Sequence, residues 1–166
     1  MYQTILVPTD GSAGASAALD EAIALAENFD ATIHSLNVVD VGAVQPEAGA
    51  VDLVESFERM GEQTTDAAVT RAADADVEAV GHVTTGTAHR AITEYVADHD
   101  VDLVVMGTHG RTGLERYLLG SVTEKVVRTA DVPVLTVRAP ADEEEGSAET
   151  DADAAGGDEP AADDGE

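Results

Sequence analysis

The segment from residue 106 to 128, "MGTHGRTGLERYLLGSVTEKVVR", is rich in both glycine and basic residues. It holds four glycines and four of the eight basic residues of the chain, against two acidic residues. Glycine lets the backbone approach a ligand closely. "SVTE" is expected to open a helix, whose first amides and dipole attract anions, and Ser121 and Thr123 add hydroxyl donors. These groups suit a chain of phosphates, and an acidic protein that holds phosphates has reason to keep its few cations beside them.

The same segment also has a purely structural interpretation. "SVTE" matches a capping box, in which Ser121 would be the N-cap and Glu124 its reciprocal partner. Arg111 and Arg116 can simply be solvated, and glycines in a loop often mark turns. Local features alone therefore leave both interpretations open.

A second candidate group follows the first apolar run, in "ILVPTDGS" at residues 5–12. Asp10 would repel phosphate unless a cation lay between them, so Mg²⁺ bridging its carboxylate and phosphate oxygens fits this position. The alternative role for Asp10 is to cap the first helix, for which Ser12 competes. The site is not a Walker loop, because G-x4-G-K-[ST] is absent and the single lysine, Lys125, falls within a predicted helix.

Other chemistries find little support in the sequence. Cysteine is absent, which excludes disulfides, thiolate metal sites and cysteine nucleophiles. The five histidines are not spaced like a metal site on one element, so zinc is not expected, and no G-x-S-x-G elbow favours a hydrolase. His34 and His82 fall in strand patterns and are expected to face solvent or pair locally, while His99 is expected at the end of a helix.

The charge is distributed unevenly along the chain. It totals −26, and residues 141–166 carry twelve acidic residues and no basic one. We expect that segment to be a disordered acidic tail, because it lacks the apolar residues that would offset its ordering entropy. Residues 1–140 form the predicted folded domain, with 22 acidic and 8 basic residues, a charge of −14.

This charge also restricts partners and surroundings. One lysine against seven arginines on an acid-rich surface is typical of a halophile, where molar salt screens charges over about 3 Å. The alternative is an acidic protein from an ordinary cytoplasm. Repulsion from phosphates argues against nucleic-acid and anionic-membrane partners. The N-terminus has neither a basic region nor a long apolar run, and no segment has about 20 apolar residues, so a cytoplasmic location is expected.

Apolar periodicity predicts an alternation of strands and helices. Strand-like segments cover 3–8, 31–39, 77–85, 101–107 and 132–138, and helical segments cover 12–29, 51–74, 87–100 and 121–130. This order predicts an α/β fold with an open five-stranded parallel sheet and helices on both faces. Such folds bind ligands outside the carboxyl ends of the strands, where the strand order reverses. If strands 3–8 and 101–107 are neighbours there, "PTDG" and "MGTHG" meet in one crevice.

The glycine spacing G-x2-G-x9-G-[ST], from Gly107 to Ser121, and the flanking strands make the chain resemble a known family. Residues 101–137 and "ILVPTDGS" are similar to the universal stress protein family, particularly its ATP-binding branch. The resemblance covers 2–138 and implies a Rossmann-like, adenine nucleotide alpha hydrolase-like sheet with strand order 3-2-1-4-5. It also implies a dimer that pairs through the last strand, 132–138.

The resemblance further implies a role for each residue of the motif. Asp10, after Pro8 and Thr9, would lie near the ribose and a bound divalent metal ion. Val38 would meet the adenine edge, and Met106 and Gly107 would form the floor beside adenine and ribose. The phosphates would be held by His109, Gly110, Gly120, Ser121, Val122 and Thr123.

The expected function is therefore that of an ATP-binding regulatory protein in the stress response, with Mg²⁺ beside the phosphates. Nucleotide occupancy would change the surface that the protein shows to a partner. Slow ATP hydrolysis would need a general base, and His109 and Asp10 are the only candidates for that role. The alternatives are an AMP-binding regulator and an interaction module of the same fold that works without nucleotide.

Overall fold

The computed structural model describes residues 1–40, 50–109 and 119–139. Within these ranges the elements run in the order β1 (Thr4–Pro8), α1 (Ala13–Phe29), β2 (Thr32–Val39), α2 (Ala50–Ala73), β3 (Ala79–Thr85), α3 (Ala88–Asp98), β4 (Leu103–Gly107), α4 (Ser121–Thr129) and β5 (Val134–Val137). Every described element lies where the apolar periodicity predicts it, with ends that differ by two residues at most. None of the helices in these ranges is both long enough and apolar enough to cross a bilayer.

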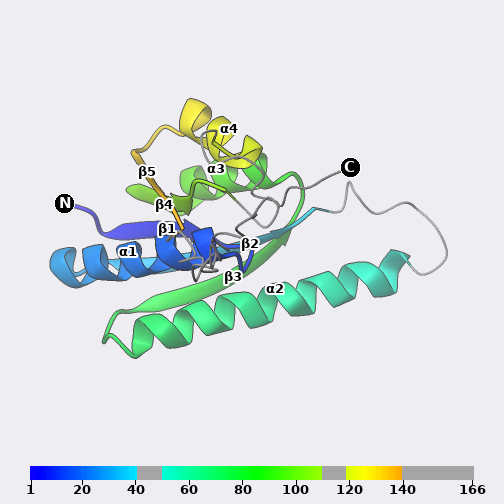
Figure 1. Cartoon of the computed structure of the whole chain (residues 1–166), viewed down its shortest axis with the longest axis horizontal. Helices are drawn as coiled ribbons and strands as arrows, with labels where there is room; N and C mark the ends of the chain where they lie inside the picture. The colour runs from blue at the N-terminus through cyan, green and yellow to red at the C-terminus, as the bar shows by residue number, and fades with distance from the viewer. Residues whose placement is uncertain (41–49, 110–118, 140–166) are drawn as a thin grey trace, which may run out of the picture.

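The strands form one parallel sheet in the order β3-β2-β1-β4-β5, which confirms the predicted fold class. From β1 the chain moves outward to β2 and β3, and it then returns to place β4 on the other side of β1. The carboxyl ends of β1 and β4 are therefore neighbours at the point of reversal. Helices α1 and α2 cover one face of the sheet, and α3 and α4 cover the other (Figure 1).

Each face of the sheet has its own apolar core, because successive side chains of a strand point to opposite sides. In β1, Ile5 and Val7 pack toward α1 and α2, whereas Leu6 packs toward α3 and α4. The α1 and α2 layer is built largely from alanines, including Ala18, Ala22, Ala68 and Ala72. These small side chains let the helices lie close to the sheet, which suits a chain with only 3% aromatic residues.

The capping residues of two helices decide between roles that the sequence left open. Ser12 is the N-cap of α1, and its Oγ accepts a hydrogen bond from the amide of Ala15 at 3.2 Å. The N-cap of α4 is Gly120, with no side-chain capping bond, so the capping-box interpretation of "SVTE" is wrong. Glu124 instead pairs with Arg128 one turn later, at 2.6 Å.

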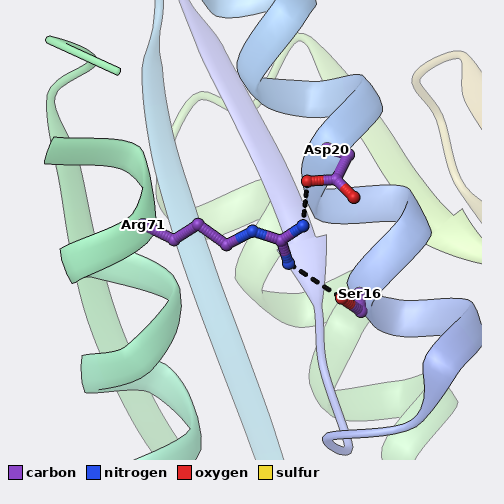
Figure 2. A network of polar contacts seen from close by, with 3 residues as sticks. All are labelled: Ser16, Asp20 and Arg71. Carbon is purple, nitrogen blue, oxygen red and sulfur yellow. Dashed lines mark hydrogen bonds and ion pairs between the residues drawn. The ribbon is translucent and has the colours of Figure 1, made fainter. Parts of the chain in front are cut away.

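A polar bridge joins α2 to α1 across the groove between them (Figure 2). Arg71 donates one hydrogen bond to Ser16 Oγ at 2.8 Å and forms an ion pair with Asp20. The side chains of Arg71 and Asp20 are 42% and 58% exposed, so solvent screens the pair and its contribution is at most about 1 kcal/mol. The bridge orients the two helices, but the apolar core beneath them supplies most of the stability.

Two glycines let α1 sit directly on the end of β4. A Cβ atom added to Gly107 would lie 2.7 Å from the carbonyl carbon of Gly14, and one added to Gly14 would lie 2.6 Å from the carbonyl oxygen of His109. Both distances are shorter than real Cβ contacts. The close approach that Gly107 permits is therefore made by α1, and the contact with a ligand that its place in the motif implies stays a prediction.

We expect Gly107→Ala to lower the free energy of unfolding by about 1–3 kcal/mol, because α1 must move to admit the methyl group. Urea denaturation at constant salt measures this. The neighbouring, nearly volume-conserving change Met106→Leu is the control and should cost less than about 1.5 kcal/mol. A Gly107→Ala variant as stable as the wild type would show that α1 does not need this contact.

Candidate functional site

A cavity of about 650 Å³ opens at the carboxyl ends of β1, β2 and β4. It is lined by eleven of the twelve residues that the family motif points to: Pro8, Thr9, Asp10, Val38, Met106, Gly107, His109, Gly120, Ser121, Val122 and Thr123. The twelfth, Gly110, lies outside the described residues. The fold thus brings residues from four separate segments to one place, where open parallel sheets bind their ligands.

The loop after β1 is held from β2. The amide of Thr9 donates to the carbonyl of Leu36 at 2.8 Å, and Asn37 Nδ2 donates to the carbonyl of Thr9 at 2.8 Å. Asp10 Oδ1 accepts from the amide of Ser12 at 3.0 Å. These bonds present the carboxylate of Asp10 at the cavity, while Ser12 caps α1. Sequence reasoning missed Asn37, an amide side chain near the carboxyl end of β2.

The floor and one wall of the cavity are apolar. Met106 and Leu36 are 5% and 1% exposed, and Val38 lies beside them on the same face of β2 as Leu36. Ala88 and Ile92 of α3, one turn apart, complete this wall. Leu36, Ala88 and Ile92 were also missed by sequence reasoning, although strand and helix periodicity place them on the faces that lead to the cavity. A flat apolar ring could pack against this surface.

The start of α4 supplies donors at the opposite side. The first bond within the helix runs from the amide of Glu124 to the carbonyl of Gly120, at 2.9 Å. The amides of Ser121, Val122 and Thr123 precede that bond, so they have no acceptor within the helix. Ser121 is exposed. The positive end of the helix dipole adds to the attraction that these amides exert on an anion.

Thr123 has a different hydroxyl contact from the predicted one. Its Oγ1 donates to the carbonyl of Gly107 at 2.9 Å, and the residue is only 3% exposed. The amide of Gly120 donates to the carbonyl of Thr108 at 2.7 Å. These two bonds fasten α4 to the end of β4. The hydroxyl of Thr123 therefore positions the helix, and Ser121 is the residue whose hydroxyl can reach a ligand.

The basic side chains of residues 106–128 that the structure describes do not line the cavity. Lys125 is exposed on α4, and Arg128 is paired with Glu124. Arg111 and Arg116 lie outside the described residues. The expectation that basic side chains gather at the site is thus not met by the described cations. Among the described groups, the first backbone amides of α4 are the ones that favour an anion there.

His109 brings an imidazole to the edge of the cavity. Its Nδ1 lies 3.2 Å from Thr108 Oγ1. Its Nε2 is buried and has no hydrogen-bond partner in the described structure. Buried polar atoms nearly always have a partner, so a ligand group that reached this nitrogen would complete its hydrogen bonding.

A metal ion at this site would need oxygen atoms from a bound molecule in addition to those of the protein. In the described parts of the chain, no three histidine or acidic side chains are arranged to hold a metal ion. Asp10 and Asp40 both line the cavity. Mg²⁺ commonly binds through one or two carboxylates together with the phosphates of a ligand, and the carboxylate of Asp10 fits that mode.

The family model described as "Universal stress protein family" matches residues 1–138. Universal stress protein MJ0531 of Methanocaldococcus jannaschii is 37% identical over 143 residues, which cover 84% of each chain. Universal stress protein UspA from Lactobacillus plantarum superposes with a TM-score of 0.76 at 28% identity and covers 82% of this chain and 98% of its own.

A third similar protein is a universal stress protein solved in complex with cAMP. Its TM-score is 0.67 at 26% identity, over 84% of this chain and 99% of its own. The match thus extends over nearly the whole described region, including both loops that meet at the cavity. The chain belongs to the universal stress protein family.

Proposed function

We propose that the cavity binds an adenine nucleotide, ATP in the first place, and that the protein works as a nucleotide-dependent regulator of the stress response. The observation that carries this proposal is the convergence of three kinds of surface in one cavity: an apolar wall, a carboxylate loop and the first amides of α4. Adenine would pack on the wall formed by Val38 and Met106. The phosphates would lie over Gly120 and the amides that follow it.

A related structure supports the class of ligand. The similar universal stress protein in complex with cAMP carries an adenine nucleotide. A short or cyclic phosphate is therefore the second candidate ligand for this chain, because the same amides could hold one phosphate as well as three. Titration calorimetry with ATP, AMP and cAMP separates these candidates. Binding of none of them would favour an interaction module that works without nucleotide.

Regulation accounts for the site better than rapid turnover does. His109 is oriented by Thr108 and presents a buried Nε2, which allows a slow hydrolysis of ATP in which this nitrogen orients water. Apart from His109, the described residues that line the cavity offer only the carboxylates of Asp10 and Asp40 as bases. Nucleotide occupancy would instead bias the conformation of the cavity rim and so change affinity for a partner protein.

Salt is part of the proposed working condition. The charge of −26 with a single lysine suits a halophile, and at low salt self-repulsion would weaken both folding and the binding of a polyanion. Binding experiments should therefore span low to molar salt. We expect affinity for ATP to rise with salt, because screening reduces the repulsion more than it reduces short-range bonds to backbone amides.

We expect Ser121→Asp to weaken ATP binding while it leaves folding intact or slightly more stable. An acidic side chain at the first position of α4 stabilises the helix dipole by about 0.3–1 kcal/mol, but it repels a phosphate at the same place. Thr70→Asp adds the same charge at an exposed position of α2, outside the residues that line the cavity, and serves as the control. Calorimetric titration and urea denaturation measure the two effects. If the two variants bound ATP with equal affinity, the phosphates would not lie at the start of α4.

We expect Asp10→Asn to weaken ATP binding in Mg²⁺ and to leave it unchanged or stronger in chelator. The amide keeps an oxygen that can accept from Ser12, but it loses the negative charge that holds the metal ion. The same charge opposes bare phosphates when no metal is present. Titrations with and without Mg²⁺ give the comparison. A loss of equal size under both conditions would mean that Asp10 acts only on the structure of the loop.

We also propose a dimer that pairs through β5, the last strand of the described sheet. The carbonyls of Pro133 and Val137 accept hydrogen bonds from Val104 and Thr108 at the β4 side. Because backbone groups alternate along a strand, those of Val134 and Thr136 face the outer edge. That edge can pair with a second copy, and Leu135, 36% exposed, adds apolar surface.

We expect Thr136→Pro to convert the dimer to a folded monomer. Proline removes the outward amide but none of the bonds to β4, and edge strands tolerate it at such positions. Sedimentation equilibrium and circular dichroism test this. Thr136→Ser, which keeps the amide, should remain dimeric. A dimeric Thr136→Pro variant would place the interface elsewhere.

A further inference from the structure

A cluster of aromatic and imidazole rings joins α3 to the β2–β3 edge of the sheet. We call His34 of β2, His82 of β3, Tyr95 of α3 and His99, the C-cap residue of α3, the histidine cluster. The ring centroids of His34 and His82 are 5.8 Å apart, those of His82 and His99 5.8 Å, and those of His34 and His99 6.2 Å. Three of the five histidines of the chain therefore meet at one seam, although they come from three different elements.

Tyr95 organises the cluster. Its ring stacks on that of His99 with centroids 3.7 Å apart and an interplanar angle of 7°. Its hydroxyl lies 3.0 Å from His34 Nδ1, and its carbonyl accepts a bond from His99 Nδ1 at 3.1 Å. A carbonyl only accepts, so Nδ1 of His99 carries the hydrogen of that bond. Tyr95 is 8% exposed, and burial raises its pKa to about 12, so it stays neutral at any physiological pH.

The cluster gathers basic groups without a counterion among the described residues. The titratable groups that face one another are His34 from β2, His82 from β3, and Tyr95 and His99 from α3. Burial, and then the nearby charges of His82 and His99, lower the pKa of His34. Burial, and then His99, lower the pKa of His82. No carboxylate contributes to either shift, so a proton on one ring opposes a proton on the next.

The interface between β2 and α3 that contains the histidine cluster continues to the proposed nucleotide cavity, where it forms one wall. On β2, His34 and Val38 are four residues apart and point to the same face of the sheet. On α3, Ile92 and Ala88 lie one and two turns ahead of Tyr95, on the same side of the helix. Val38, Ala88 and Ile92 line the cavity. A change in how α3 sits on the sheet at the histidine cluster therefore moves the apolar wall of the cavity.

We propose that the histidine cluster is a proton-sensitive latch, which holds α3 on the sheet when the imidazoles are neutral and loosens it when more than one is protonated, so that acidification weakens ligand binding. The part that concerns the ligand rests on the proposed nucleotide function. The signal would be intracellular pH, and the moving element would be α3.

The direction of the effect follows from the two lowered pKa values. In the unfolded chain these histidines bind protons at their usual value near 6.5, whereas in the folded protein they resist protonation. Their contribution to stability is therefore fully present above about pH 6.5 and is lost as the pH falls below it, because the unfolded state then binds more protons. Loosening of α3 is a local unfolding reaction, so it should depend on pH in the same direction as global unfolding.

The test compares the wild type with His82→Gln and His89→Gln between pH 7.5 and 5.5, in chelator and at constant salt. The ring of His82 contacts the rings of His34, Tyr95 and His99 and has no hydrogen bond to a described residue, so glutamine removes its charge without leaving a partner unpaired. His89, at the start of α3, lies outside the cluster and is the control. Amide exchange of α3, corrected for intrinsic pH effects, and ATP affinity are measured for each protein.

Acidification should accelerate exchange in α3 and lower ATP affinity by about fivefold or more in the wild type and in His89→Gln, and much less in His82→Gln. The phosphate of ATP titrates near pH 6 with every variant. The difference between variants therefore gives the contribution of the protein to the pH dependence. Equal pH dependence in all three proteins would overturn the proposal. A pH dependence seen only without chelator would also overturn it, since the effect would then depend on a metal ion and not on the imidazoles alone. If no protein binds ATP at any pH, the nucleotide function fails, and the exchange of α3 still decides whether the latch exists.

Discussion

The close packing of two helix starts on the end of β4 is the constraint on which the rest of the site depends. Gly14 of α1 and Gly107 of β4 meet at backbone distance, where a methyl group on either would collide with the other segment. On the opposite face, Thr123 donates to the carbonyl of Gly107 and fastens α4 to the same strand end. The cavity exists because both helices are held at this point, and its donors are the amides that the packing of α4 leaves facing it.

An acidic protein can hold phosphates in such a cavity because the attraction is local and the repulsion is screened. Backbone amides and a helix dipole act within one turn of the helix, whereas net charge acts over distances that salt shortens. The described cations of the 106–128 segment lie on the outer surface of α4, where Arg128 pairs with Glu124. In the proposed nucleotide site, oriented dipoles and a metal ion at Asp10 would therefore matter more than the basic side chains that the structure describes.

The fold and most of the cavity lining could be predicted because they follow from local patterns. Each strand and helix has its own period, and parallel order with short connections leaves few topologies. The glycines and Ser121 lie close together in sequence, so their spacing could be matched to the family motif, which pointed to the cavity. The roles of Ser12, Gly120 and Thr123 could not be separated in advance. Whether a hydroxyl caps a helix, binds a ligand or fastens one element to another depends on which acceptor lies within 3 Å of it.

The sequence by itself determined the order of elements, the apolar faces, the acidic composition and the family motif, because these depend on residue type and on neighbours along the chain. Only the tertiary structure decided that Gly107 meets Gly14, that Asn37 holds Thr9, and that three histidines from β2, β3 and α3 share one seam with Tyr95. Such contacts join residues up to 93 positions apart, as from Gly14 to Gly107. No periodicity encodes them, since they arise from strand register and helix placement, which the packing of the whole sheet sets.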